Sequence, residues 1–480
     1  MNDNMPTGGR DDASETSGVP GSATPGESSV GGGERPGPSR RRFFGTAAAT
    51  AAAALAAGGV GGYAIKASND RDATSSGAAS SATASSAAEG TGAAKPGGAT
   101  STDRSALIVP FYGVKQAGIT TAQQERMMFA SLDVTSTDPK DLQFLLGRWA
   151  ALAARFTAGK SVSSSPDDPA APPLDTGEAL DSGPYSLTIT VGLGASLFDD
   201  RFGLAGQMPA ALEPLGTIPG DAVLQPALTG GDLCIQACAD DPQVVFHAVR
   251  NMVRAARGTA VLRWSQLGFG RASATGAGQT TPRNLMGFKD GTNNIHADDV
   301  PATSEHVWVG DETDQAWMKG GSYLVARKIR MEIESWDTDD LDDQEKIFGR
   351  TKVNGDPLSG GTEFTPIDFD KKAADGTPVI DVRSHVRLAS PEANGGVRIL
   401  RRGYNYTDGQ DPETGKLAAG LFFISYQRNP HTQFKVLQSR LGASDLLNEY
   451  IAHVGGGIWA CPPGVTAAGD WYAKSLFRAI

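Results

Sequence analysis

Apolar side chains recur at helical spacing in two stretches of the chain, and each stretch follows an Asp-Pro pair. The stretch after Asp138-Pro139 has an apolar stripe made of Leu142, Leu145, Leu146, Trp149, Leu152, Ala153 and Phe156. The stretch after Asp241-Pro242 has a second stripe made of Val245, Ala248, Val249, Met252 and Ala256. An Asp cap followed by proline is a specific helix start, because the N–H that proline lacks has no partner in the first turn anyway. The pattern therefore predicts two amphipathic helices, each with one face to bury.

Runs rich in β-branched and aromatic residues precede these helices and recur later in the chain. Four runs lead into a helix start, and they are residues 126–134, 233–239, 323–336 and 421–427. The last run leads into Asn429-Pro430, where we expect a helix to begin as it does after the Asp-Pro pairs. Two further runs, residues 185–191 and 260–264, also have the composition of strands.

The order of these elements indicates a duplication. Each predicted helix has a single apolar face, so the helices should cover one side of largely antiparallel sheets. We therefore predict an α+β fold of the dimeric α+β barrel type, with ferredoxin-like halves at residues 106–270 and 320–480. The connection between them, residues 271–319, is too long for a passive turn, and we expect it to carry function.

The first hundred residues have a different composition. Residues 1–38 are rich in Gly, Ser and Pro and nearly free of large apolar side chains, which is typical of disorder. The stretch Ser39-Arg40-Arg41-Arg42-Phe43-Phe44-Gly45 then precedes an uncharged, mildly apolar stretch, residues 46–65. This pattern resembles a twin-arginine export signal, and the alternative is a basic patch beside an Ala-rich run.

We accordingly predict a disordered n-region plus signal at residues 1–67 and a flexible linker at residues 68–105. The expected partner of the signal is the twin-arginine export machinery, with only a transient contact to the membrane. The expected location is extracellular, periplasmic or associated with the cell envelope. The cleavage site stays open because small residues recur throughout the linker.

Composition excludes several classes of function. Lys and Arg number 43 against 54 Asp and Glu, and the resulting net charge of −11 argues against nucleic acid or an anionic membrane as the main partner. Three cysteines are too few for a disulfide framework or a four-cysteine metal cluster, and we expect Cys234, Cys238 and Cys461 to be structural. The six histidines include no HxH or HExxH pair, which argues against a locally encoded zinc or di-iron site. We expect His247 to be solvated.

Three later stretches combine residue types that chemistry uses. The stretch Gly287–Asn294 flanks Asp290 with glycines, whose tight backbone can present N–H groups to an anion; the alternative is an Asp-Gly turn. In Arg398–Tyr406, alternation along a strand would point one arginine inward, where it needs an anionic partner. His385 lies in a short polar-apolar stretch ahead of Ser390-Pro391 and is a candidate ligand.

Taken together, these motifs resemble the dye-decolorizing (DyP-type) peroxidases, and in particular their exported branch that includes the deferrochelatase/peroxidases. The motifs are GFKDGTNN (287–294), IFGRTK (347–352), SHVRLASP (384–391), RILRRGYNY (398–406) and GLFFISYQRN (420–429). Residues 109–119 also resemble the opening of that branch, with Lys115 where the family has His. The match runs in order from about residue 106 to 480. The family fold, a pair of ferredoxin-like halves, agrees with the duplication.

The resemblance implies a haem b cofactor and a role for each site residue. His385 would be the proximal ligand of the haem iron, Asp290 the distal carboxylate that moves a proton, and Arg401 the distal arginine that stabilises negative charge. The other residues expected to bind the cofactor are Gly291, Thr292, Asn293, Arg350, Ser390 and Pro391. Glu449 would accept the second ring N–H of His385. Phe422 or Phe423 would line the distal side.

The implied reaction reduces H2O2 through a ferryl intermediate and oxidises dyes, phenolics or other one-electron donors. Two alternatives stay open: a deferrochelatase that releases iron from haem with the porphyrin intact, and a non-catalytic haem carrier, which the presence of both Asp290 and Arg401 disfavours. Bulky dyes cannot reach a buried haem, so electron transfer through aromatic side chains is a further hypothesis. Its candidates are Trp264, Tyr404, Tyr406 and Trp459, although such residues are more often core. The physiological reductant and the oligomeric state, a homo-oligomer included, are left open.

Overall fold

The computed structural model describes residues 104–412 and 414–479 of the chain. The expected export signal at residues 1–67, and the linker up to residue 103, lie outside the described residues. Among the helices that are described, none combines the length and the apolar character needed to cross a membrane.

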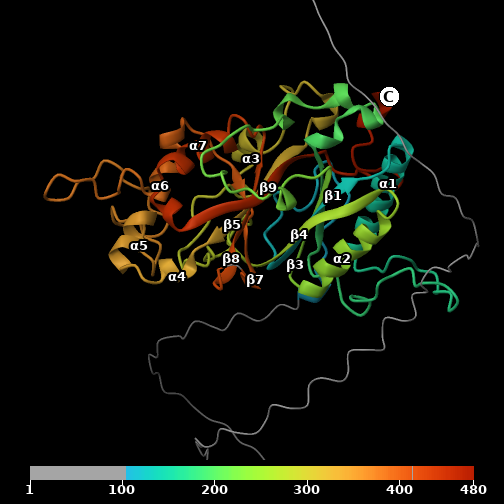
Figure 1. Cartoon of the computed structure of the whole chain (residues 1–480), viewed down its shortest axis with the longest axis horizontal. Helices are drawn as coiled ribbons and strands as arrows, with labels where there is room; N and C mark the ends of the chain where they lie inside the picture. The colour runs from blue at the N-terminus through green and yellow to red at the C-terminus, as the bar shows by residue number, and fades with distance from the viewer. Residues whose placement is uncertain (1–103, 413, 480) are drawn as a thin grey trace, which may run out of the picture. The chain divides into compact units, whose positions relative to one another are not determined.

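One antiparallel sheet of nine strands forms the centre of the described structure (Figure 1). The strands of the N-terminal half are β1 (Arg126–Val134), β2 (Thr188–Gly194), β3 (Leu233–Ala239) and β4 (Ala260–Arg271). Those of the C-terminal half are β5 (Ser322–Met331), β6 (Leu400–Arg401), β7 (Tyr404–Gln410), β8 (Leu417–Gln427) and β9 (Ile451–Cys461). The first half has the order β4-β1-β3-β2, and the second repeats it as β9-β5-β8-β7, with the short β6 paired to β8.

The two halves join into a closed barrel. β2 pairs with β9, β4 pairs with β7, and β5 pairs with both β8 and β9, so the ring of strands returns to its start. The strand order fourth-first-third-second, found twice, is that of the ferredoxin-like unit. The predicted fold class, α+β with two ferredoxin-like halves, is confirmed.

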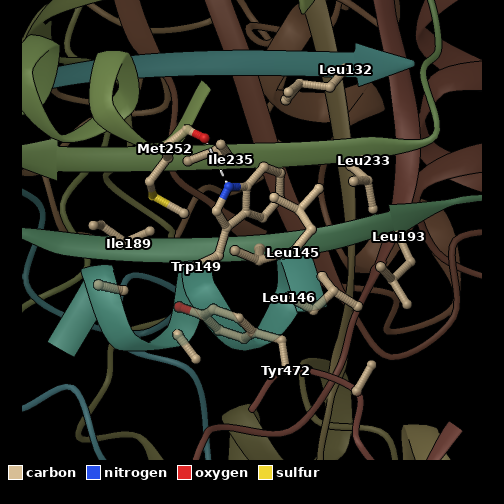
Figure 2. Close-up of a cluster of buried hydrophobic side chains, with 14 of the residues drawn as sticks. Leu132, Leu145, Leu146, Trp149, Ile189, Leu193, Leu233, Ile235, Met252 and Tyr472 are labelled. Carbon is tan, nitrogen blue, oxygen red and sulfur yellow. Dashed lines mark hydrogen bonds between the residues drawn. The ribbon is translucent and has the colours of Figure 1, made fainter. Parts of the chain in front are cut away.

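Helices flank the barrel on both halves (Figure 1). They are α1 (Pro139–Phe156), α2 (Pro242–Ala255), α3 (Val300–His306), α4 (Ile333–Trp336), α5 (Leu341–Phe348), α6 (His385–Leu388) and α7 (Phe434–Ser444). α1 and α2 begin as predicted: the Asp138 side chain accepts from the backbone N–H of Lys140, and Asp241 accepts from two N–H groups of the first turn of α2. Their apolar stripes pack together and onto the strands, and the Trp149 indole donates to the Met252 carbonyl at 2.9 Å (Figure 2).

Two sequence expectations are wrong in their local detail. Asn429-Pro430 does not begin a helix: the Asn429 side chain accepts from the N–H of His431 in a turn, and α7 begins only at Phe434. The run 323–336 is a strand only to Met331, after which the chain turns into α4. A turn thus separates β8 from α7, and the short helix α4 lies between β5 and α5.

His247, expected to be solvated, is buried. Its Nε2 lies 2.7 Å from Oδ1 of Asp175, and the neighbouring Asn251 bonds Thr176. The segment that carries Asp175 therefore covers the polar side of α2, which the periodicity of the helix alone cannot reveal. The three cysteines are free and buried.

Aromatic side chains fill the interior of the barrel. The cluster includes Phe129, Trp264, Tyr404, Tyr406, Phe422 and Trp459, each at most 6% exposed. The four residues considered for electron transfer are thus all core residues. These side chains pack the barrel interior, so we look for a ligand site outside it.

Candidate functional site

A cavity of about 460 Å³ lies on the outer face of the C-terminal strands, under α5, α6 and α7. Side chains alternate along a strand, so Phe422 and Ile424 of β8 point into the barrel while Leu421 and Phe423 face the cavity. Phe423, one of two phenylalanines expected on the distal side, therefore lines the cavity. The volume of the cavity falls within the range of about 300–1,000 Å³ that is usual for ligand pockets.

The cavity brings together residues that lie far apart in the sequence. Of the expected site residues it is lined by Asp290, Gly291, Thr292, Asn293, Arg350, His385, Ser390, Pro391 and Arg401. The long connection between the halves supplies the first four, and loops and short elements of the C-terminal half supply the rest. The strands and α7 add mostly apolar walls.

His385 begins α6 and is held from behind by a carboxylate. Its Nδ1 lies 2.6 Å from Oδ2 of Asp445, whose side chain is only 2% exposed. Oδ1 of Asp445 accepts the N–H of Leu447 at 2.9 Å, so both carboxylate oxygens are fixed. Burial lowers the pKa of His385, but the charge and hydrogen bond of Asp445 outweigh it, and the net effect is a raised pKa. No described residue bonds Nε2, which leaves that nitrogen for a ligand in the cavity.

The expectation that Glu449 supports His385 is wrong, because Asp445 occupies that position. Both belong to the segment after α7, where Asp445 caps the 3₁₀ helix Leu446–Glu449 and Glu449 ends it. Glu449 is exposed and does not line the cavity. One helical turn separates the two carboxylates. The sequence feature that could have pointed to Asp445 is its position directly before a helical turn, where Asp is a preferred cap and its side chain is held in place.

Asp290 and Arg401 form an ion pair at the cavity. Nη1 of Arg401 donates to Oδ1 of Asp290 at 2.5 Å, and the two side chains are 28% and 15% exposed. The side-chain amide of Asn294 holds the main chain of Arg401. It donates to the Arg401 carbonyl and accepts from the Arg401 N–H, both at 2.8 Å. Asp290 raises the pKa of His385 and Arg401 lowers it, so the ion pair and the imidazole share one electrostatic environment. Sequence reasoning gave Asn294 no role.

The glycine after Asp290 is required by close packing. Gly291 has φ +106°, and a Cβ there would lie 3.0 Å from Cα of Ser273. Side chains next to it are tied to Glu363: Lys289 forms an ion pair with it, and Thr292 donates to it at 3.2 Å. The connection is thereby held against the cavity wall.

Arg350 supplies a cation to the same wall. Its Nη1 donates to the carbonyls of Gly355 at 2.7 Å and Glu363 at 2.8 Å, and burial lowers its pKa. Among the described residues, no carboxylate lies within ion-pair distance of Arg350. Arg350 is half-buried, and the charges of Glu363 and Asp356 act against the effect of burial on its pKa. The remaining N–H groups of the guanidinium suit an anionic group on a ligand. Ser390, by contrast, uses its hydroxyl to accept the N–H of Ala393 at 3.1 Å.

The residues that line the cavity suit a metal ion that is already bound by an organic cofactor and needs few ligands from the protein. Within residues 104–412 and 414–479 there is no group of three His, Cys, Asp or Glu that could hold a metal ion. His385 nonetheless has the carboxylate-backed imidazole of a metal ligand. Apolar walls, the carboxylate-backed imidazole of His385 and an arginine without an ion-pair partner among the described carboxylates match an iron porphyrin with anionic propionates.

The chain matches two domains of known proteins. Residues 116–270 match the N-terminal domain of DyP-type peroxidases, and residues 281–466 match their C-terminal domain. Deferrochelatase of Escherichia coli is 38% identical over 388 residues, which cover 79% of this chain and 90% of that protein.

Two solved structures have the same fold, each with a TM-score of 0.72 and 37% identity over 79% of this chain. One is a DyP-type peroxidase from Streptomyces coelicolor, of which 99% is covered. The other is the oxyferrous/water mixed complex of DtpA from Streptomyces lividans, of which 100% is covered.

Proposed function

This chain belongs to the family of DyP-type peroxidases, and on that premise we propose that its cavity holds haem b and that His385, Asp290 and Arg401 act on it. As a member of the family it is a haem peroxidase, which reduces H2O2 and oxidises organic one-electron donors. The observation that carries the assignment of residues is the presence of a carboxylate-backed imidazole and an Asp–Arg pair in one cavity.

Nε2 of His385 would hold the iron, and Arg350 would pair with a propionate. When bound, haem supplies a redox-active iron that takes up the oxidising equivalents of the peroxide. Asp445 orients the imidazole. It also accepts a hydrogen bond from the N–H at Nδ1, which makes Nε2 a more basic ligand.

Asp290 and Arg401 divide the work on peroxide. Arg401 donates to Oδ1 of Asp290 at 2.5 Å, whereas Oδ2 accepts a longer hydrogen bond from Asn284, at 3.4 Å; Oδ2 is therefore the oxygen that takes a proton from the first peroxide oxygen and returns it to the departing one. Arg401 keeps its positive charge throughout and stabilises negative charge that develops on the peroxide oxygens. The side chain of Asn294 holds Arg401 in place by two hydrogen bonds to the main chain of the arginine.

The same ion pair argues against the two alternatives. A haem carrier needs an imidazole and an apolar cavity, but neither a proton shuttle nor a distal cation. Several relatives are named deferrochelatase, yet release of iron with an intact porphyrin gives no reason to pair Asp290 with Arg401. Peroxide cleavage uses both.

The test starts from the full chain produced with haem. We expect a Soret band that His385→Ala abolishes and that His431→Gln, a histidine outside the cavity lining, leaves unchanged. With stoichiometric H2O2, Arg401→Leu should slow the spectral change about 100- to 1,000-fold without loss of haem. A chain that binds no haem contradicts the proposal, and metal-free porphyrin appearing during incubation identifies iron release instead.

We also propose that residues 1–67 direct export by the twin-arginine route. The support is the Arg40-Arg41 pair ahead of the uncharged stretch 46–65. Replacement of both arginines by Lys keeps the charge, and it should retain the protein in the cytoplasm when whole cells are fractionated. Unchanged export would contradict the proposal.

A further inference from the structure

A second histidine–carboxylate pair lines the same cavity and has no part in the proposed reaction with peroxide. Nδ1 of His453 on β9 lies 3.1 Å from Oδ1 of Asp221. Arg327 on β5 holds that carboxylate at both oxygens, from Nε at 3.2 Å and from Nη2 at 2.9 Å. The three side chains are between 5% and 10% exposed, and His453 and Arg327 line the cavity.

The contacts determine which nitrogen of His453 is available. Burial raises the pKa of Asp221, but His453 and Arg327 outweigh it, so the net pKa is lowered and the carboxylate stays ionised. An ionised carboxylate can only accept a hydrogen bond, so it favours the tautomer with its N–H at Nδ1. In that tautomer of the neutral imidazole the lone pair is on Nε2. No described residue bonds Nε2 of His453.

The surroundings of this pair are built from both halves of the chain. Asp221 comes from the segment between β2 and β3, which is anchored by Leu215 and Ile218 against Val325 and Phe434. Nη1 of Arg327 donates to the Ala326 carbonyl at 2.9 Å, while Nε and Nη2 donate to Asp221, so all three nitrogens are held and the arginine serves to position Asp221.

Aromatic side chains adjoin the pair. The guanidinium of Arg327 lies over the ring of Phe434 at 5.1 Å, and Phe434 lies 6.0 Å from Phe423. Phe423 is the cross-strand partner of Arg327, and His453 is that of Ile329, two residues further along β5. This part of the cavity therefore presents a proton acceptor beside apolar and aromatic faces.

We propose that His453 is the base that removes the hydroxyl proton of a phenolic donor bound beside Phe423 and Phe434, with Asp221 and Arg327 as positioning residues. The proposal rests on the peroxidase function above. In each step the O–H bond of one phenol breaks, its proton passes to Nε2 of His453, and one electron passes to the haem oxidised by H2O2. The product is a phenoxyl radical, and two phenols are consumed for each peroxide reduced.

The test compares a donor that must lose a proton with one that does not. Guaiacol loses a proton and an electron, whereas ferrocyanide loses only an electron. His453→Gln should lower kcat/KM for guaiacol by about 100-fold, within the usual contribution of a general base, and change the value for ferrocyanide less than twofold. Asp221→Asn should follow the same split with a smaller loss. His431→Gln is the matched control and should alter neither value.

A second readout needs no turnover. Guaiacol binding to resting holoenzyme, measured by calorimetry without peroxide, should weaken about fivefold in His453→Gln, as expected for the loss of one hydrogen bond. A shifted Soret band or weaker haem binding would overturn the proposal, because the pair would then hold the cofactor. An equal loss with both donors, or no loss with either, would also overturn it. A wild-type chain that fails with ferrocyanide contradicts the peroxidase function itself.

Discussion

Replacement of Asp445 by Asn removes one negative charge from behind His385 and keeps the size of the side chain. The amide oxygen of Asn can still accept the N–H of Leu447, so the 3₁₀ helix keeps its cap. The amide NH₂ group then faces Nδ1 of His385 in place of a carboxylate oxygen. A donor at that position favours the tautomer with its proton on Nε2, where the iron must bind.

The expected loss can be worked from the geometry. The contact is 2.6 Å long and Asp445 is 2% exposed, so solvent does not weaken the pair as it would at the surface. A hydrogen bond to a charged group contributes about 1.5–3 kcal/mol. Loss of a carboxylate behind a ligating histidine weakens metal binding about 10- to 100-fold, which is about 1.4–2.7 kcal/mol. The two ranges overlap, and the unfavourable tautomer puts our expectation at the upper end, about 100-fold.

The assay is titration of haem-free protein with haem, followed by the Soret absorbance, with circular dichroism to show that each variant is folded. Glu449→Gln provides a matched control, since it removes the same charge one helical turn away at an exposed position. We expect it to bind haem as the wild type does. Unchanged binding by Asp445→Asn, or equal losses in the two variants, would refute the role of Asp445.

Four further outcomes are expected. Burial lowers and Asp445 raises the pKa of His385, with a net increase; haem affinity should therefore fall as the pH drops through this raised value. The same raised pKa stabilises the haem-free fold below about pH 6.5, where the imidazole is protonated in both states. This stabilisation is lost as the pH rises through the pKa of His385 in the folded state. Urea denaturation at several pH values would measure the loss. Leu146→Ala in the core should cost about 2–5 kcal/mol in urea denaturation, whereas Phe144→Ala, 72% exposed on the same helix, should cost little. Gly291→Ala should weaken haem binding in a Soret titration, because φ +106° strains a residue with a Cβ and that Cβ would lie only 3.0 Å from Cα of Ser273.

Much of the fold could be predicted because its signals are local. The caps at Asp138 and Asp241 and the stripes that follow them depend on residues within one helix. The duplication emerged from the order of such elements. Asn429-Pro430 shows the limit of this reasoning: the pair forms a turn, while the side chain of Gln433 donates to the carbonyls of His306 and Arg398. Those partners are distant in sequence, and no local pattern reveals them.

The site was predictable in its residue types and less so in its pairings. The family motifs pointed to His385, Asp290 and Arg401, which all line one cavity. They did not reveal that Asp445 rather than Glu449 meets the imidazole, because a shift of four residues at a helix end depends on how that segment packs. The contact between Asp221 and His453 joins the two halves of the chain and had no signal in the sequence.

The charges around the two histidine–carboxylate pairs explain why one suits iron and the other suits a proton. Among the described residues, Asp445 has no cationic partner except the imidazole of His385, so with a neutral imidazole that pair carries one negative charge. Such a charge favours an electron-poor metal centre at Nε2. Asp221 is neutralised by Arg327, so the pair with His453 carries no net charge until the imidazole takes up a proton. A site of that kind does not attract a metal cation, and it can take up and release a proton without leaving a buried carboxylate unpaired.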